Sequence, residues 1–303
     1  MISALKWTVI TLGSLVLFFL FGSGSDPIAY AWKMSPGTAY FTEPDAAQLG
    51  ILKPQTLPMF GVLAGPVGEA SATSSIRSVR IPIMVYHSVR PYIPDESAYQ
   101  DAYDVTPELL EEELQYLHKQ GYHTVTFAAV SEYFERGTPL PEKPVILSFD
   151  DGWRNQFVYA FPLLQKYGAK GTFFIFTNPI EYEKDHWMSW DEVRTLDRAG
   201  MEIGGHTKTH PILRDIMSDA ALDIEIGGGK KLIEERIGHP ITAFAYPFGL
   251  FNSETNAAVL RAGYHMARTV YKGVWNDPEH RLVVHGTLSS DQLKDFEKLL
   301  ETE

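Results

Sequence analysis

The sequence of 303 residues contains no cysteine. This absence excludes disulfide bonds, thiolate metal sites and cysteine nucleophiles, so any bound metal ion must be held by histidine, aspartate or glutamate. A chain without cysteine is compatible with export from the cytoplasm, but the absence does not establish export.

Basic residues are also scarce. There are 26 lysines and arginines against 38 aspartates and glutamates, which gives a formal net charge of -12. Nucleic-acid binding requires a basic surface to neutralise phosphates, so we predict no nucleic-acid partner. Hydrophobic residues make up 45% and charged residues 21%, which is typical of a globular protein with a full core. The length suits one large domain with accessory segments, or two small domains.

One long hydrophobic run lies near the N-terminus, from Trp7 to Phe21, directly after Lys6. It is close to the short limit of the roughly 17–25 residues that span a membrane. Its position favours an export signal over a buried core helix. We therefore predict that residues 1–25 are a signal peptide or a membrane anchor, attaching through residues 7–21. The protein is expected to be exported, either secreted or held at the outer face of the cytoplasmic membrane.

Two further regions follow. Residues 26–80 are rich in Pro, Gly, Ser, Thr and Ala without a sustained period, which predicts an extracytoplasmic spacer. Residues 81–303 alternate short apolar runs with amphipathic segments, which predicts one α/β domain with a parallel sheet, open or closed into a barrel. The expected strands are 81–86, 145–149, 172–176, 201–204, 242–246 and 265–270. Chemistry in such folds collects at the carboxyl ends of the strands.

Capping residues in the sequence indicate where helices of this domain begin and end. Thr106 and Pro107 provide an N-cap hydroxyl and a proline at the first helical position, and Gly121 provides a C-terminal stop. Other helices are expected through residues 161–164, 191–199, 218–237 and 253–262.

The first chemical constellation is Asp150 and Asp151, in SFDDG at the end of the strand 145–149. Paired carboxylates before a glycine often form only a polar turn, but the end of a strand is a site position in this fold class. Neighbouring carboxylates suit two roles, because a metal ion can neutralise one while the other stays basic enough to accept a proton.

The second constellation is His206 and His210, in GGHTKTHP directly after the strand 201–204. Histidines four residues apart can share an ion on one face of a helical turn. An isolated pair with this spacing is common by chance. Together with the aspartates, however, it makes a His, His, Asp set with open coordination positions, which is typical of a catalytic zinc site.

Two weaker segments also end strands. Phe248 lies in FAYPFG, which alone reads as an aromatic turn, and His87 lies in YHS, where a lone histidine is more often structural.

Taken in order, these segments resemble the NodB-like polysaccharide deacetylases, carbohydrate esterase family 4. SFDDG stands at the family's TFDDG position and HTKTH at its H(S/T)xxH position, with KGTFFIF between them. The resemblance covers residues 81–303 and implies a distorted (β/α) barrel with about seven parallel strands. It implies that Asp150 is the general base and that Asp151, His206 and His210 hold the metal ion.

The third family motif departs from its usual form, close to R-P-P-Y-G, because Ala245 stands where the arginine is expected. No convincing DxxDW motif is present either. This joint loss resembles the poly-N-acetylglucosamine deacetylase branch. The backbone N–H of Phe248 can still serve as an oxyanion donor, since that role needs no side chain.

Two histidines, His87 and His285, are candidates for the general acid. His285 lies in roughly the region of the family's late histidine, but its surroundings look like a terminal strand and helix. We prefer His87, because it follows the first strand and a barrel would bring it to the metal ion. Sugars require flat aromatic surfaces, and Trp153, Trp190 and Tyr246 are the candidates. Trp187 is equally well explained as a core or rim residue.

The predicted activity is hydrolysis of the acetamide of N-acetylglucosamine-type residues in an extracellular or cell-wall polysaccharide, with release of acetate. The polymer is left open among poly-N-acetylglucosamine, peptidoglycan and chitin oligomers. The metal ion is expected to be Zn²⁺, with Co²⁺, Ni²⁺ and Mn²⁺ as alternatives for the same ligands. Competing functions are an O-acetyl esterase acting on acetylated xylan-like polymers, a hydrolase of small cyclic amides, and a catalytically silent polysaccharide-binding protein.

Overall fold

The computed structural model describes residues 7–12, 15–20, 78–94, 103–182 and 186–302. The chain divides into two compact units, residues 1–69 and 70–303. In the first unit, strand β1 (Trp7–Leu12) pairs antiparallel with β2 (Leu15–Leu20). Across the described parts of the chain, no helix combines the length and apolar character needed to cross a bilayer. The rest of the predicted signal or anchor, residues 1–25, and most of the predicted spacer, residues 26–80, lie outside the described residues, so both remain predictions.

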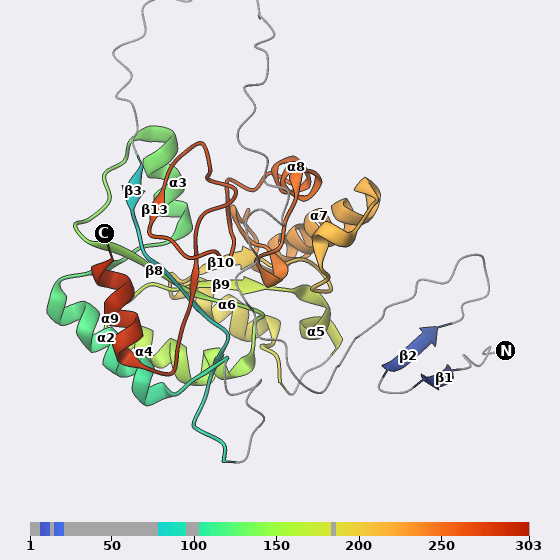
Figure 1. The fold of residues 1–303 in the computed structure, drawn as a ribbon, viewed down its shortest axis with the longest axis horizontal. Helices are drawn as coiled ribbons and strands as arrows, with labels where there is room; N and C mark the ends of the chain where they lie inside the picture. The colour runs from blue at the N-terminus through green and yellow to red at the C-terminus, as the bar shows by residue number, and fades with distance from the viewer. Residues whose placement is uncertain (1–6, 13–14, 21–77, 95–102, 183–185, 303) are drawn as a thin grey trace, which may run out of the picture. The chain divides into compact units, whose positions relative to one another are not determined.

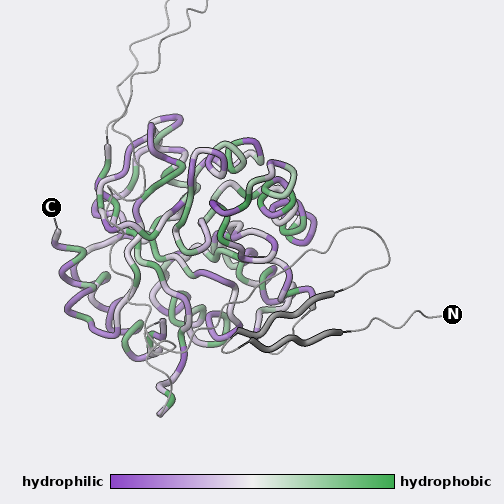
Figure 2. The backbone as a smooth tube through the Cα atoms, turned by 45° about the vertical axis from the view of Figure 1, so that its right-hand side comes forward, coloured by the Kyte–Doolittle hydropathy of each residue, from purple (hydrophilic) through white to green (hydrophobic). Residues whose placement is uncertain are grey.

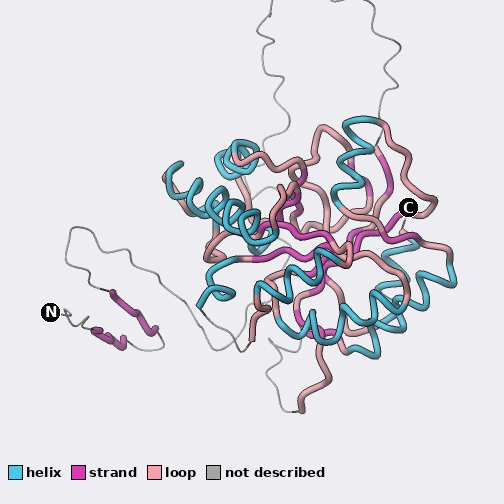
Figure 3. Tube along the Cα trace, turned by 180° about the vertical axis from the view of Figure 1, so that it is seen from behind, coloured by secondary structure: helices cyan, strands magenta, loops and turns pink. Residues whose placement is uncertain are grey.

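The second unit contains one central parallel sheet with helices on either side (Figures 1 and 3). Its strands are β4 (Ile83–Tyr86), β8 (Pro144–Phe149), β9 (Thr172–Ile175), β10 (Glu202–Gly205), β11 (Ala243–Ala245), β12 (Met266–Arg268) and β14 (Thr287–Leu288). They run in the order β12-β11-β10-β9-β8-β4-β14, and the short strand β7 (His123–Thr124) also pairs with β8. Every pairing in this sheet is parallel.

The two ends of the sheet are linked through one segment of the chain. Arg268 of β12 forms a parallel bridge with Val284. Three residues later the same segment becomes β14, where Thr287 pairs with Met84 of β4. The sheet therefore curls toward closure, and the predicted distorted barrel with about seven parallel strands is confirmed.

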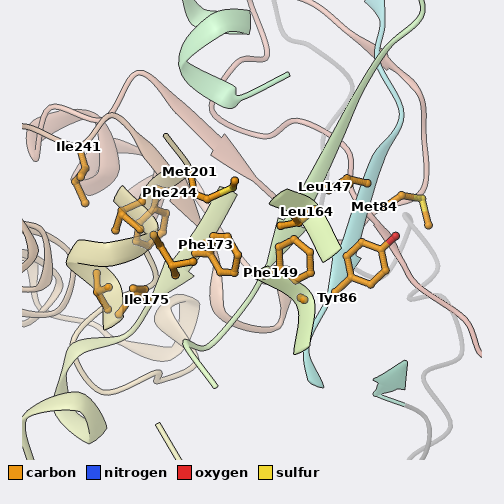
Figure 4. Close-up of a cluster of buried hydrophobic side chains, with 14 of the residues drawn as sticks. Met84, Tyr86, Leu147, Phe149, Leu164, Phe173, Ile175, Met201, Ile241 and Phe244 are labelled. Atoms are coloured by element: carbon orange, nitrogen blue, oxygen red, sulfur yellow. The ribbon is translucent and has the colours of Figure 1, made fainter. Parts of the chain in front are cut away.

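The core explains why these short runs form strands. Residues of β8 from Val145 to Phe149 are all buried, as expected for a strand covered on both faces. Phe149 stacks between Tyr86 and Phe173, with ring centroids 5.0 and 4.8 Å away. Figure 4 shows this row of rings from three adjacent strands inside the larger apolar cluster. These contacts fix the ends of β4 and β8, from which site residues project.

Helix ends follow the local signals. Helix α2 (Pro107–Gln120) begins after Thr106, whose side chain accepts a hydrogen bond from Leu109, and it ends at Gly121 in a left-handed conformation. In Figure 2 hydrophilic and hydrophobic residues alternate along the helices, because one face of each packs on the core. The other helices of at least eight residues are α3 (Phe127–Arg136), α6 (Trp190–Arg198), α7 (Asp219–Ile237), α8 (Ser253–Arg261) and α9 (Leu293–Glu301).

Shorter elements complete the unit. They are β3 (Val79–Arg80), β5 (Ser88–Val89), β6 (Asp104–Val105), the π-helix η1 (Gln156–Ala160), α4 (Phe161–Lys166), α5 (Thr177–Tyr182), the 3-10 helices η2 (Leu213–Asp215) and η3 (Pro247–Gly249), and β13 (Trp275–Asn276). The sequence patterns did not predict α3, α5 or the π-helix. The predicted strands and helices are present, with ends shifted by a few residues.

Candidate active site

The three predicted metal ligands meet at the carboxyl edge of the sheet. Asp151 follows β8, and His206 and His210 follow β10. Atom Oδ1 of Asp151 lies 3.5 Å from Nε2 of His206 and 3.4 Å from Nε2 of His210. The two imidazole Nε2 atoms are 3.1 Å apart. All three ligand atoms lie within 4.8 Å of one another.

This donor set suits a divalent cation. Oδ1 of Asp151 is buried and has no hydrogen-bond partner among the described residues, which is costly for a carboxylate oxygen unless a cation binds there. Ring atom Nδ1 of His206 lies 2.7 Å from the carbonyl oxygen of Ala245. Because Nδ1 must carry the proton to donate to that carbonyl, Nε2 is left with its lone pair facing the site.

The protonation states favour the same reading. Burial, followed by the neighbouring His206, lowers the pKa of His210 to about 4, so its imidazole is neutral at neutral pH. Burial opposes ionisation of Asp151, yet the neighbouring His206 and the other surrounding imidazoles hold the pKa of Asp151 well below its usual range. A neutral imidazole and an ionised carboxylate are the forms that bind metal ions.

The ligand loop is not the helical turn that the sequence predicted. The backbone at residues 206–210 is irregular, and Thr207 and His210 both adopt left-handed conformations, with φ of 72° and 58°. The hydroxyl of Thr207 accepts a hydrogen bond from the backbone N–H of His210 at 2.9 Å. Asp151 and Phe248 are also left-handed, with φ of 76° and 60°. Such backbone strain concentrates at functional sites, where packing and hydrogen bonds maintain it.

Helix α7 holds this loop in place. The carboxylate of Glu225 accepts hydrogen bonds from the backbone N–H groups of Lys208 and Thr209, at 3.2 and 2.9 Å, and from the Thr209 hydroxyl at 2.8 Å. One turn later, a Cβ on Gly229 would lie 2.8 Å from the carbonyl oxygen of Thr207. The loop therefore packs directly on the helix backbone at a position that only glycine leaves open.

Asp150, the predicted base, is 2% exposed and lies beside the triad. Both of its carboxylate oxygens lie 2.5 Å from Nη2 of Arg268. Arg268 is fully buried at the end of β12. We did not predict Arg268 as a site residue from the sequence. A lone arginine inside the expected strand HMARTV could have indicated a buried ion pair, because a buried guanidinium requires a partner.

Of the two candidate general acids, only His87 lies close to Asp150, the predicted general base. Its Nε2 is 3.9 Å from Oδ2 of Asp150, and its ring stands edge-on to Tyr103. His285 instead has Nδ1 3.2 Å from the carbonyl oxygen of Trp275. Among the described residues, no contact joins His285 to Asp150 or to the three ligands.

Aromatic rings surround the ligands. Trp153 stacks on Trp187 at 4.0 Å and donates its indole N–H to Oδ2 of Asp151 at 3.1 Å. Phe176 contacts the rings of both Trp187 and His210, at 5.0 and 5.2 Å. Phe248 lies 4.7 Å from the His210 ring and is 42% exposed. Trp153 therefore contacts the site directly.

The other two predicted sugar-binding aromatics lie elsewhere. Tyr246 is 1% exposed and packs between Phe244 and Phe251, so the prediction that it offers a surface to a sugar is wrong. The indole N–H of Trp190 donates to Glu181, and the guanidinium of Arg236 lies over its ring. Within the described residues, Trp190 has no contact with the three ligands.

Comparisons with known proteins agree with this geometry. Residues 137–267 match the polysaccharide deacetylase family model. The chain is 27% identical over 209 residues to YxkH of Bacillus subtilis, itself provisionally named a polysaccharide deacetylase, covering 69% of this chain and 71% of that protein. It is 26% identical over 216 residues to the poly-beta-1,6-N-acetyl-D-glucosamine N-deacetylase of Staphylococcus epidermidis, covering 66% and 72%.

A solved structure shares the fold. The Streptococcus pyogenes deacetylase PplD, in complex with acetate, superposes with a TM-score of 0.70 at 24% identity and covers 75% of this chain and 100% of that one. Fold, family match and relatives together define a hydrolase acting on amide bonds of acetylated polysaccharides. Within that class, residues 137–267 match the polysaccharide deacetylase model, and the chain is similar to the NodB-like deacetylases of carbohydrate esterase family 4.

Proposed function

We propose that this protein is a metal-dependent N-deacetylase that removes acetyl groups from N-acetylglucosamine-type residues of an extracellular or cell-wall polysaccharide. The observation that carries the proposal is the Asp151, His206 and His210 set with the second carboxylate, Asp150, beside it. A histidine, His87, lies within reach of that second carboxylate.

Asp151, His206 and His210 would hold one divalent ion, and Zn²⁺ suits two imidazoles and a carboxylate with open positions. Bound there, the ion would supply Lewis-acid chemistry that polarises the acetamide carbonyl and makes a water molecule easier to deprotonate. Co²⁺, Ni²⁺ and Mn²⁺ accept the same ligands.

The chain's own residues would then divide the proton transfers. Asp150 accepts a proton from water as the water oxygen bonds to the acetamide carbon. The backbone N–H of Phe248 donates to the carbonyl oxygen, which gains negative charge. His87 donates a proton to the nitrogen as the carbon–nitrogen bond breaks, because an amine leaves poorly unless it is protonated. The products are acetate and a free glucosamine-type amine.

Poly-N-acetylglucosamine is our first choice of polymer. The support is the similarity to a relative named for that substrate and the absence from this sequence of the usual third-motif arginine at Ala245. Trp153, beside Asp151, is the aromatic surface that we propose for a sugar ring. We also retain export, through residues 1–25, as part of the proposal, since a polymer of this kind lies outside the cell.

The experiment is an acetate-release panel. The full chain is stripped of metal, reconstituted with one equivalent of Zn²⁺, and incubated with poly-N-acetylglucosamine, peptidoglycan, chitin oligomers and acetylated xylan. Release from the first substrate with little from the others is the expected result. Release from acetylated xylan alone would replace the proposal with an O-acetyl esterase. No release from any polymer by the zinc-loaded protein would support a silent binding protein.

A further inference from the structure

We propose that Gln156 is a positioning residue that sets the distance between the acid and the base of this site. Its side-chain nitrogen, Nε2, lies 2.5 Å from the carbonyl oxygen of His87 and 2.5 Å from the carbonyl oxygen of Asp150. These carbonyls belong to the residues that follow β4 and β8. One amide group therefore connects the backbones that carry the two proton-transfer side chains.

Only a primary amide suits this position. Its single nitrogen carries two hydrogens and can donate to two carbonyl oxygens at once, whereas a carboxylate would repel both. Gln156 is fully buried, and its Oε1 has no hydrogen-bond partner among the described residues. An unpartnered buried acceptor destabilises the folded protein, and methionine would avoid that cost. The two donated hydrogen bonds are thus the feature that the amide alone provides.

The neighbouring residue extends the same connection. The amide nitrogen of Asn155 donates to the Ser88 hydroxyl at 2.8 Å, and its oxygen accepts from the Val89 N–H at 3.3 Å. Asn155 and Gln156 together therefore hold residues 87–89 to the chain that follows Asp150. We name these four hydrogen bonds the Asn155–Gln156 clamp.

The local backbone explains how the clamp is formed. Gln156 is the first residue of the π-helix η1. Its backbone carbonyl accepts a hydrogen bond from the backbone N–H of Phe161. A π-turn has one more residue than an α-turn and is often found at functional sites. The turn begins five residues after Asp151, so the clamp and the base lie on the same short segment. His87 comes from a distant part of the sequence and depends on the clamp for its position.

The chemistry makes the proposal testable, because it separates acid catalysis from attack. An amine leaving group needs a proton from His87, whereas the phenolate of 4-nitrophenyl acetate leaves without one. Displacing His87 should therefore slow amide hydrolysis and leave aryl-ester hydrolysis almost unchanged. This inference rests on the proposed function, since it assumes that His87 is the acid.

The test compares Gln156→Met with the wild-type full chain, both loaded with Zn²⁺. We expect kcat for deacetylation of a β-1,6-linked N-acetylglucosamine oligomer to fall at least about 10-fold. Hydrolysis of 4-nitrophenyl acetate should stay within about 2-fold, and Zn²⁺ affinity should be unchanged. A crystal structure of the variant should show His87 Nε2 and Asp150 Oδ2 further apart than the 3.9 Å seen here. Gln165→Met, at an exposed position of α4, is the matched control and should match the wild type.

Equal losses on the two substrates, or no loss on either, would overturn the proposal. If Gln156→Met does not fold, Ser88→Ala breaks the clamp at a partly exposed hydroxyl, and the same change in the amide-to-ester ratio is expected in smaller measure. An unchanged ratio in Ser88→Ala would then overturn it. A wild-type protein that hydrolyses the aryl ester but releases no acetate from any N-acetylated sugar would instead contradict the proposed function, which keeps the two failures distinct.

Discussion

Ala245 and Arg268 are register partners on the neighbouring strands β11 and β12, and the guanidinium of Arg268 contacts both oxygens of Asp150. Ala245 stands where the family's usual third motif has an arginine. In this structure the positive charge therefore comes from Arg268 on the adjacent strand, directly opposite Ala245. A carboxylate that must act as a base thus keeps a fixed orientation in a buried setting.

Replacing Arg268 tests that relationship. Arg268→Met leaves Asp150 buried without its cation, and breaking a buried pair in this way typically costs about 3–5 kcal/mol of stability. Arg268→Lys keeps the charge but has no planar fork, so we expect a more stable variant whose kcat is still reduced by about 10-fold or more. Thermal melts and acetate-release kinetics measure the two effects. Arg136→Met, which breaks a surface pair with Glu132, should change neither.

Substitutions of the adjacent Asp150 and Asp151 should have different effects on Zn²⁺ affinity and on kcat. In Asp151→Asn the ion loses its only anionic ligand among the three, so Zn²⁺ affinity and turnover should both fall sharply. In Asp150→Asn the ligands are intact, so Zn²⁺ should bind normally while kcat falls by about 100-fold or more, since general-base catalysis contributes roughly 10²–10⁴. Calorimetric titration with Zn²⁺ alongside kinetics separates the two. Full turnover in zinc-loaded Asp150→Asn would contradict its assignment as base.

Glu225 should influence metal binding without contacting the ion. Glu225→Gln places an amide donor against backbone N–H groups and loosens the loop that carries His210. We expect Zn²⁺ affinity to fall by about 10–100-fold, as for other outer partners of metal ligands. Competition with a chromogenic chelator measures the affinity. Glu235→Gln, at an exposed position of the same helix, is the control, and an equal affinity in the two variants would refute the role.

Glu113 should make stability depend on pH. Burial raises the pKa of Glu113 to about 8, while its carboxyl in the unfolded chain keeps an ordinary value near 4.5. Between these values the folded protein holds a proton that the unfolded chain has released. The free energy of unfolding should therefore fall as pH rises from about 4.5 to 8, and then level off.

Glu113→Gln removes this titration while still accepting the hydrogen bond from Tyr86, which is 2.8 Å long in the wild type. The variant should match the wild type near pH 4.5 and exceed its stability at pH 8, with each pKa unit corresponding to about 1.4 kcal/mol. Urea unfolding at several pH values measures the difference. Glu142→Gln, at an exposed position, should show no such trend, and parallel curves for wild type and Glu113→Gln would contradict the raised pKa.

Sequence patterns were sufficient for local features. Thr106 and Gly121 marked the ends of α2 because capping depends on residues a few positions apart. The aspartate pair, His206 and His210 were predicted to meet because both segments follow buried strands, and the strands of a parallel sheet end at one edge. The family resemblance then assigned Asp151, rather than Asp150, to the metal ion. The shape of the loop between the histidines was missed, because the left-handed turns at Thr207 and His210 are maintained by contacts with α7.

What the sequence determined on its own is most of the strands and longer helices, the family resemblance and the residues able to hold a metal ion, since these depend on short-range pattern. The tertiary structure decided which histidine lies at the base, which arginine pairs with Asp150, and that Tyr246 is in the core. Each of these joins residues many positions apart through packing across the sheet. No local pattern encodes such distances, because the register and curl of the sheet set them.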